Sequence, residues 1–268
     1  MSAAAIATAP AGQGQVHLHL DGGIASVTFD RPEARNAMTW AMYESLVRIC
    51  EQLHGDASVR VVRFRGAGGQ AFVAGTDIAQ FQAFTSGDDG VAYEKRIDAC
   101  VGLLESLPMP TVAVLEGWAI GGGLAIATAC DFRLATPGTR LGVPIARTLG
   151  NCLSMSNIAR LVAALGRPRA ERLLLLADMV TAEEAHAAGY VLEVAAPEAI
   201  DAASDKLCQR LASLAPVTQK VSKAALNRLL HAQLPEVEDL IRACYGSADF
   251  REGVQAFVGK RPPAWSGR

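Results

Sequence analysis

The stretch TVAVLEGWAIGGGLAIATACDFRLA, Thr111 to Ala135, decides the fold. It opens with β-branched residues that favour a strand, breaks at Gly117, collects three glycines at 121–123 and then runs apolar to Cys130. This pattern predicts a strand, a turn and a buried helix. Because glycine has no Cβ, a ligand can approach the backbone N–H groups at the helix start, which have no intrahelical partner and lie at the positive end of the helix dipole. We therefore expect a site for a developing negative charge.

The rest of the chain alternates strand-like and helix-like patterns, which predicts an α/β fold with parallel βαβ units. Alternating residues around the turn Asp21–Gly23 predict an opening hairpin. The expected strands are Val16–Leu20, Ile24–Phe29, Val59–Phe64, Asp131–Ala135, Arg140–Pro144 and Tyr190–Val194. The expected helices follow Thr39, cover Asp88–Leu107, Leu153–Leu165 and Pro168–Leu176, follow Thr181, and make up the chain beyond Pro197.

The composition of the chain limits the classes of function that it can have. The 268 residues are 50% hydrophobic and 19% charged with a net charge of −2, which is typical of a folded protein and provides no basic surface for nucleic acid. The longest uncharged central run is too short and glycine-rich to span a bilayer. Six cysteines without a CxxC pair favour reduced, buried thiols. Residues 1–14 lack the basic residues of a targeting peptide and predict a disordered tail. We expect a cytoplasmic protein that acts on a small molecule.

Two further patterns are ambiguous. Gly66–Ala71 fits the GxGxxA dinucleotide fingerprint after a strand, but helix-like sequence resumes only near Asp77, so a nicotinamide oxidoreductase is the weaker alternative. His17 and His19 share one face of the first strand and could ligate a metal, yet no third ligand is near. We interpret them as a solvated edge and expect no metal site.

Four motifs now coincide with a known family. They are RPEARNA (Arg31–Ala37), FVAGTDI (Phe72–Ile78), EGWAIGGGLAIATACD (Glu116–Asp131) and the C-terminal run from Asp249 to Pro262. Together they strongly resemble the crotonase superfamily, the enoyl-CoA hydratases and isomerases. The matches lie in the expected order and cover nearly the whole chain.

This resemblance implies a ββα spiral core over residues 15–196 and a helical C-terminal region over 197–268 that trimerises. The expected assembly is a homotrimer or a dimer of trimers. The implied substrate is an acyl-CoA, so coenzyme A enters as part of the substrate and no separate cofactor is expected. Neither nucleic acid nor a membrane is an expected partner.

The resemblance also assigns binding residues. The backbone N–H groups of Thr76 and Gly122 match the two donors that bind the thioester oxygen in this family. Lys260 and Arg35 match positions near CoA phosphates, although each could be an ordinary surface residue. The full set of matched substrate- or CoA-binding residues is Ala34, Arg35, Asn36, Ala74, Gly75, Asp77, Ile78, Trp118, Gly121, Phe257 and Lys260.

The sequence departs from the family at its catalytic acids. The hydratases move protons with two glutamates, since such groups can be tuned near working pH. Ala125 and Ile145 stand at the two matching positions, so standard hydration is not expected. The exact reaction, as a lyase or an isomerase, stays open, and a non-catalytic acyl-CoA-binding protein is the alternative.

Several residues near these positions could line the acyl pocket. The candidates are Phe81, Ala125, Ile145 and Arg147, with Phe84 and Trp118 as further apolar possibilities. Arg147 could bind a substrate carboxylate, or it could point outward as a surface residue, which we favour. Cys152 is read as an inert thiol and Asp77 as a residue that holds its loop. Glu116 is either a structural partner or a displaced acid.

Overall fold

The computed structural model describes residues 12–268, so the first eleven residues of the predicted tail lie outside the described residues. The chain then opens with a hairpin of β1 (Gln15–Asp21) and β2 (Ile24–Asp30), paired antiparallel. Gly22 and Gly23 both adopt positive φ at the turn, as a tight hairpin connection requires. The predicted hairpin is confirmed to within one residue at each end.

The remaining strands alternate between two sheets. The larger sheet has the order β1-β2-β3-β5-β7-β10 and the smaller one β4-β6-β8-β9. Their bounds are β3 (Val61–Gly66), β4 (Ala71–Val73), β5 (Thr111–Leu115), β6 (Trp118–Ile120), β7 (Phe132–Ala135), β8 (Arg140–Gly142), β9 (Met179–Thr181) and β10 (Glu193–Val194). Three times in succession the chain adds one strand to the larger sheet, in parallel, and the next to the smaller sheet before a helix follows. This repeated path is the expected ββα spiral.

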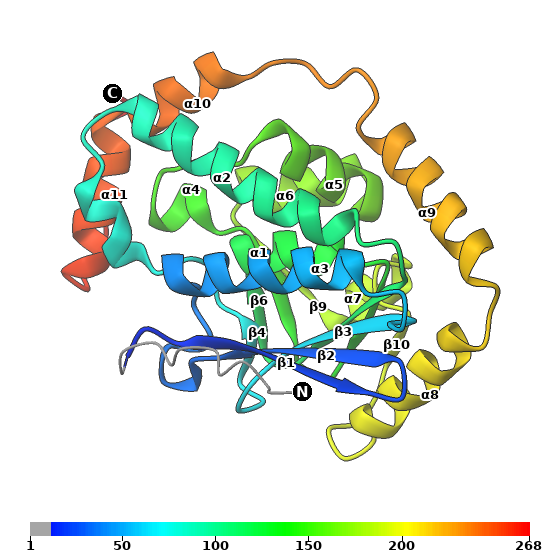
Figure 1. Cartoon of the computed structure of the whole chain (residues 1–268). Coiled ribbons are helices and arrows are strands. Elements are labelled where there is room, and N and C mark those ends of the chain that lie inside the picture. Colours follow the sequence, from blue (N-terminus) through cyan, green and yellow to red (C-terminus); the bar gives the residue numbers. More distant parts are fainter. Residues whose placement is uncertain (1–11) are drawn as a thin grey trace.

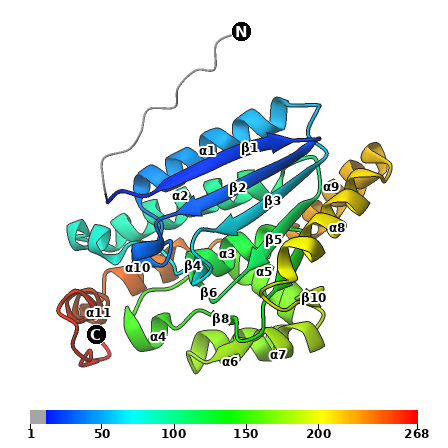
Figure 2. The same ribbon diagram turned by 90° about the horizontal axis from the view of Figure 1, so that it is seen from below.

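Helices cover both faces of the larger sheet (Figures 1 and 2). On one side lie α1 (Trp40–Gly55), α2 (Gly87–Glu105) and α3 (Gly122–Ala129), and α8 (Ile200–Ala212) packs on the other. The Thr39 side chain caps α1 by accepting from the N–H of Met42, as predicted. Because β5 is covered on both faces, all five of its residues are buried.

Two predicted strands are shifted because local hydrogen bonds compete with the ladder. The strand predicted from Val59 begins at Val61, since the Asp56 carboxylate accepts from Ser58 and makes a turn there. The strand predicted from Tyr190 begins at Glu193, because the N–H groups of Tyr190 and Val191 both donate to the Ala185 carbonyl.

The segment Gly66–Ala71 connects two strands, β3 and β4. A side chain at Gly66 would overlap the carbonyl oxygens of Ala71 and Phe72, so this glycine allows close backbone approach. The dinucleotide fingerprint therefore lacks the helix that would bind a pyrophosphate.

The middle of the chain carries short helices around the smaller sheet. They are α4 (Ile145–Thr148), α5 (Met155–Leu165), α6 (Arg167–Leu175) and α7 (Ala182–Ala187). The helix predicted to follow Thr181 is confirmed, and it begins with a capping box in which Thr181 and Glu184 exchange hydrogen bonds of 3.2 Å through their side chains and backbones.

The C-terminal region is helical, as predicted. After α8 come α9 (Pro216–Leu230), α10 (Glu238–Tyr245) and α11 (Ala248–Val258), and Figure 1 shows α9 as an outer arm before α10 returns to α2. Lys223 on α9 holds this arm to the core through a 2.7 Å ion pair with Asp131. His231, at the end of α9, is partly buried and its Nε2 lies 2.7 Å from Glu105 Oε2. Within residues 12–268, no helix is long and apolar enough to cross a bilayer.

Candidate functional site

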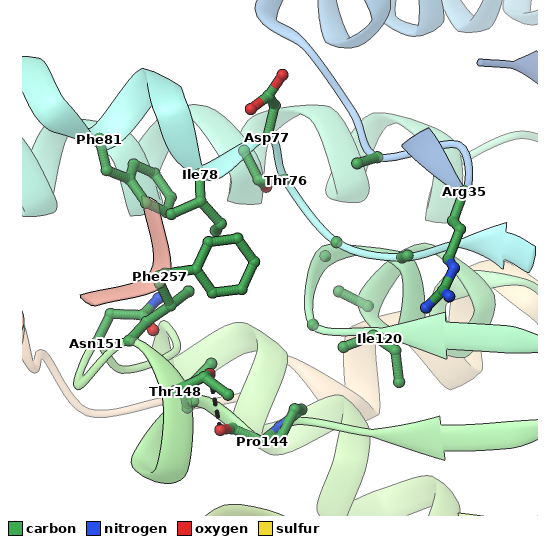
Figure 3. A pocket seen from close by; sticks show the side chains of 18 of the residues that line it. Arg35, Thr76, Asp77, Ile78, Phe81, Ile120, Pro144, Thr148, Asn151 and Phe257 are labelled. Carbon is green, nitrogen blue, oxygen red and sulfur yellow. Dashed lines mark hydrogen bonds between the residues drawn. The ribbon is translucent and has the colours of Figure 1, made fainter. Parts of the chain in front are cut away.

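One cavity of about 770 Å³ gathers most of the predicted site residues (Figure 3). It lies among the loop before α1, the segment after β4, the start of α3, α2, α4 and the end of α11. The predicted residues that line it are Ala34, Arg35, Ala74, Gly75, Thr76, Asp77, Ile78, Phe81, Trp118, Gly121, Gly122, Ala125, Ile145, Phe257 and Lys260.

Thr76 presents its backbone N–H away from its strand neighbour. Met38 forms a parallel bridge with Thr76, donating to Gly75 O at 2.8 Å and accepting from Asp77 N at 2.9 Å. Because successive N–H groups of an extended chain point to opposite sides, the Thr76 N–H points away from Met38. Among residues 12–268, no backbone acceptor pairs with the N–H of Thr76 or Gly122.

The Thr76 side chain is fixed in the core. Its Oγ1 lies 2.8 Å from the Tyr43 hydroxyl and 2.9 Å from the Tyr93 hydroxyl, and all three residues are buried. These two bonds satisfy a buried hydroxyl and hold the backbone at this position. The threonine therefore turns its side chain inward and leaves its N–H for the cavity.

The three consecutive glycines are needed for different reasons. Gly121 has φ +52° and ψ −116°, a conformation in which an L side chain is strained, although the space beside it is open. A Cβ on Gly122 would lie 2.7 Å from the Tyr43 hydroxyl, and one on Gly123 would overlap the Val73 carbonyl oxygen. The glycines thus allow the start of α3 to approach the Val73–Thr76 segment.

The exposed part of the cavity is polar. Arg31, Glu33 and Arg35 line it from the loop containing the short 3₁₀ helix η1 (Pro32–Ala34), and Lys260 lines it after α11. Figure 3 shows Phe257 between Ile78 and Thr148, so α11 contributes one wall. Asp77 accepts from Arg31 Nη1 at 2.9 Å and from Ala79 N at 3.1 Å, capping the 3₁₀ helix η2 (Ile78–Ala83). It therefore holds its loop, as interpreted.

Asn36 is a correction to the predicted set, because it is fully buried and does not line the cavity. Its side-chain amide donates to Ala67 O and Ala71 O, and its Oδ1 accepts from Arg31 N at 2.9 Å. These bonds tie three loop segments together. Asn36 supports the shape of the loop that carries Ala34 and Arg35.

The buried part of the cavity is mostly apolar. Phe81, Ile97, Ala125 and Ile145 line it and are at most 9% exposed. Phe84 packs against Phe81 with ring centroids 5.1 Å apart, but it is not a lining residue. The positions matching the family's two glutamates therefore present only hydrocarbon to the cavity.

Arg147 takes the outward orientation that we favoured over an acyl-pocket role, since it is exposed on α4 and does not line the cavity. Of its two orientations, the outward one is observed. Glu116 also lies outside the cavity and pairs with Arg65 Nε at 2.8 Å, which makes it a structural partner. The hydrogen bond with Cys244, and then burial, raise the pKa of the Cys152 thiol, as expected for an inert cysteine.

Sequence reasoning missed Glu94, which is one of the polar residues in the buried part of the cavity, together with Asn151 and Asn157. Glu94 on α2 is 3% exposed, and Asn151 lies in the loop after α4. A signal for Glu94 exists in the sequence: it stands three residues after Val91 and three before Ile97, on the apolar face of the predicted helix. A carboxylate on such a face is rarely buried without a partner or a role. Within residues 12–268, no group of three His, Cys, Asp or Glu side chains could hold a metal ion.

Comparisons with known proteins give consistent results. The family described as Enoyl-CoA hydratase/isomerase matches residues 19–268. A short-chain-enoyl-CoA hydratase of Clostridium acetobutylicum is 30% identical over 92% of this chain and 95% of its own length. A 1,2-epoxyphenylacetyl-CoA isomerase of Escherichia coli is 30% identical over 93% of this chain and 97% of its own.

Solved structures agree with these sequence matches. The crystal structure of an enoyl-CoA hydratase from Mycobacterium avium subsp. paratuberculosis has a TM-score of 0.82 and 30% identity, and the alignment covers 94% of this chain and 98% of that one. The resemblance therefore extends through both the spiral core and the C-terminal helices.

Proposed function

Because the chain belongs to the enoyl-CoA hydratase/isomerase family, we propose that it binds an acyl-CoA and stabilises an enolate-like thioester with the N–H groups of Thr76 and Gly122. The observation that carries this proposal is the close approach of two backbone segments whose N–H groups have no backbone acceptor among residues 12–268. Donors of this kind, fixed before the reaction, are worth roughly 3 to 4 kcal/mol of barrier each in enzymes from which one has been removed.

The division of the cavity supports the same substrate. Cationic Arg35 and Lys260 stand at its exposed part, where CoA phosphates would bind, and mostly hydrocarbon lines its buried part, where an acyl chain would lie. Coenzyme A then enters as part of the substrate, and we propose no separate cofactor.

The proposed reaction is a proton transfer within the acyl group, as in an isomerase or a lyase, and not standard hydration. Ala125 and Ile145 supply no carboxylate to activate water. Relatives of similar identity are named as a hydratase and as an epoxide isomerase, so family membership alone does not select the reaction. A non-catalytic acyl-CoA-binding protein is the second candidate, favoured by the same two apolar residues.

Binding and turnover separate these readings. We expect butyryl-CoA to bind more tightly than its thioether analogue butyl-CoA, which lacks the carbonyl oxygen, by at least tenfold if the donors contribute about 1.4 kcal/mol to binding. Equal affinity would reject the proposed donors. Crotonyl-CoA should bind without detectable hydration, and rapid hydration would reject our interpretation of Ala125 and Ile145.

We also propose that the chain assembles as a homotrimer or a dimer of trimers. The support is a set of exposed apolar side chains on the outer arm α9 and on α10, namely Val217, Val221, Leu226, Leu229 and Leu240. Light scattering of the wild type should give a trimer or hexamer mass. The double substitution Val221→Glu and Leu229→Glu should reduce that mass, while Leu175→Glu on α6, equally exposed, serves as the control.

A further inference from the structure

Glu94 is the buried carboxyl group of the cavity, at 3% exposure. It follows Tyr93 on α2, and Tyr93 bonds Thr76 at 2.9 Å. Two consecutive residues of one helix thus reach the proposed oxyanion site and the buried end of the same cavity. Position 94 lies outside the four sequence motifs that carry the family resemblance.

Two hydrogen bonds hold the Glu94 carboxyl, one on each oxygen. The Tyr245 hydroxyl donates to Oε1 at 2.6 Å, and the Ser154 N–H donates to Oε2 at 2.9 Å. Asn151 donates to the same Tyr245 hydroxyl at 3.2 Å, while its buried Oδ1 has no partner among residues 12–268. Each carboxyl oxygen can form two hydrogen bonds, so both keep capacity for a further contact.

The surroundings make both protonation states of this carboxyl accessible. Burial raises the pKa of Glu94 to about 8, against the hydrogen bonds from Tyr245 and Ser154 and with repulsion from Asp98 and Cys244. The titratable groups that face it are Tyr93 and Asp98 on α2, Cys244 and Tyr245 on α10, Tyr43 on α1 and Cys152 after α4. Charged Lys95 and Glu238 line the smaller cavity beside it, and Asn151 and Ser154 are its other polar neighbours. A group that gains and loses a proton near neutral pH suits general acid–base chemistry.

Glu94 also lines a second cavity of about 180 Å³, between α2 and the start of α10. This smaller cavity is lined by Asp98, Ser156 and Glu238, and by the exposed residues Lys95 and Glu236. The carboxyl group therefore lines both the buried part of the larger cavity and a smaller cavity that exposed residues also line.

We propose, building on the thioester-binding function above, that Glu94 carries the proton that is moved at the acyl group, in the place of the carboxylates missing at Ala125 and Ile145. Its carboxylate takes a proton from the carbon next to the thioester. The C–H electron pair becomes the C=C bond of an enolate, and the carbonyl π pair moves to the oxygen held by Thr76 and Gly122. The neutral Glu94 then returns a proton to carbon, so that atoms and electrons balance without another reactant.

A purely structural role for Glu94 is the competing explanation, and Asp98 offers a matched comparison. Both carboxylates hold Ser154: Glu94 accepts its N–H and Asp98 accepts its hydroxyl at 2.6 Å. Only Glu94 lines the larger cavity. Variants at these two positions should therefore share any effect on the loop but differ in chemistry.

The test follows exchange of α-protons with D₂O in phenylacetyl-CoA and butyryl-CoA by NMR. We expect exchange by the wild type, and a loss of at least about 100-fold in Glu94→Gln, the usual contribution of a general base. The Kd of both esters should change less than threefold. Asp98→Asn should keep its maximal rate within threefold and shift the rate profile to lower pH, since a repelling charge is removed.

Tyr245→Phe provides a readout that does not depend on the folding of Glu94→Gln. Loss of its hydrogen bond should raise the pKa of Glu94 and shift the profile to higher pH, opposite to Asp98→Asn. Unshifted profiles, or wild-type exchange in Glu94→Gln, would overturn the proposal. Binding of both esters without exchange by the wild type would also reject Glu94 as the carrier, whereas failure to bind them would reject the proposed function itself.

Discussion

Tyr43 and Thr76 lie with their hydroxyl oxygens 2.8 Å apart, next to the cavity that Thr76 lines. The same tyrosine oxygen would be 2.7 Å from a Cβ on Gly122. One side chain from α1 thus touches both segments that carry the proposed donors, although it does not line the cavity.

Tyr43→Phe should therefore affect rate more than stability. Loss of one buried hydrogen bond is expected to lower the free energy of unfolding by about 1 kcal/mol. Loosening of the Thr76 backbone should slow α-proton exchange by about tenfold, because small displacements of reacting groups are costly. Tyr190→Phe is the control. Its hydroxyl lies 2.9 Å from the Thr128 hydroxyl, and neither residue lines the cavity. The free energy of unfolding in urea should therefore fall by a similar amount, while the rate of α-proton exchange should not change.

Gly121→Ala should separate backbone strain from steric overlap. Gly121 and Gly138 both have positive φ, +52° and +79°, with open space where a Cβ would stand. Alanine at either position should cost about 1 to 2 kcal/mol of stability. Only Gly121→Ala should also weaken thioester binding and slow exchange, as calorimetry and NMR can show. Equal activity in the Gly121→Ala and Gly138→Ala variants would show that the start of α3 does not contribute to the site.

Lys260→Ala should weaken binding of CoA esters, whereas Arg147→Ala should not. Lys260 lines the exposed part of the cavity and Arg147 does not. An exposed charge contact is worth about 0.2 to 1 kcal/mol, so the Kd should rise by up to about fivefold at low salt and less at high salt. A larger loss in Arg147→Ala, measured by titration calorimetry, would contradict the outward orientation of this residue.

The stability of the wild type should fall as pH rises through the range set by Glu94. The pKa of this group is raised in the folded state to about 8, from 4.5. Between these values the folded state keeps a proton that the unfolded chain releases, so stability decreases with pH by at most about 1.4 kcal/mol per unit. Glu94→Gln removes this slope, and its stability relative to the wild type should grow from about pH 5 to pH 8 in urea unfolding.

Glu105 should give the opposite dependence of stability on pH. Burial alone would raise the pKa of Glu105, but Arg160 and then His231 lower it below its ordinary value. This carboxylate stabilises the fold above its unfolded pKa, and that contribution is lost as pH falls. The deficit of Glu105→Gln should therefore shrink toward acid pH, and parallel curves for both variants would contradict the two assignments.

Much of the larger sheet and nearly every helix could be predicted from the sequence, because their patterns are long. The β5 and α3 stretch and the helix after Thr39 carry enough apolar residues to fix their type and position. Of the smaller sheet, only β8 was predicted in this way, as the expected strand Arg140–Pro144. Its strands β4 and β6 have three residues each, and such short segments become strands only when a distant partner pairs with them.

The lining of the cavity could be predicted where it depends on the backbone, and not where it depends on side-chain direction. The glycine run by itself indicates an anion site at the helix start that contains Gly122. The outward turn of Arg147 and the buried position of Asn36 depend on local helix and loop geometry that a sequence motif does not encode. Glu94 lies in none of the four motifs that carry the family resemblance, so a motif search does not single it out.

The proposed donors of this site belong to the main chain, and this has an evolutionary consequence. A backbone N–H is supplied by any residue except proline, so point substitutions can exchange the side chains around the thioester without deleting the groups that hold its oxygen. The absence of a carboxyl at 125 and 145 then need not prevent function, because a carboxyl on another helix can serve the same anchored thioester. In such a protein, the residue that carries the proton can change its position in the sequence while the backbone donors stay the same.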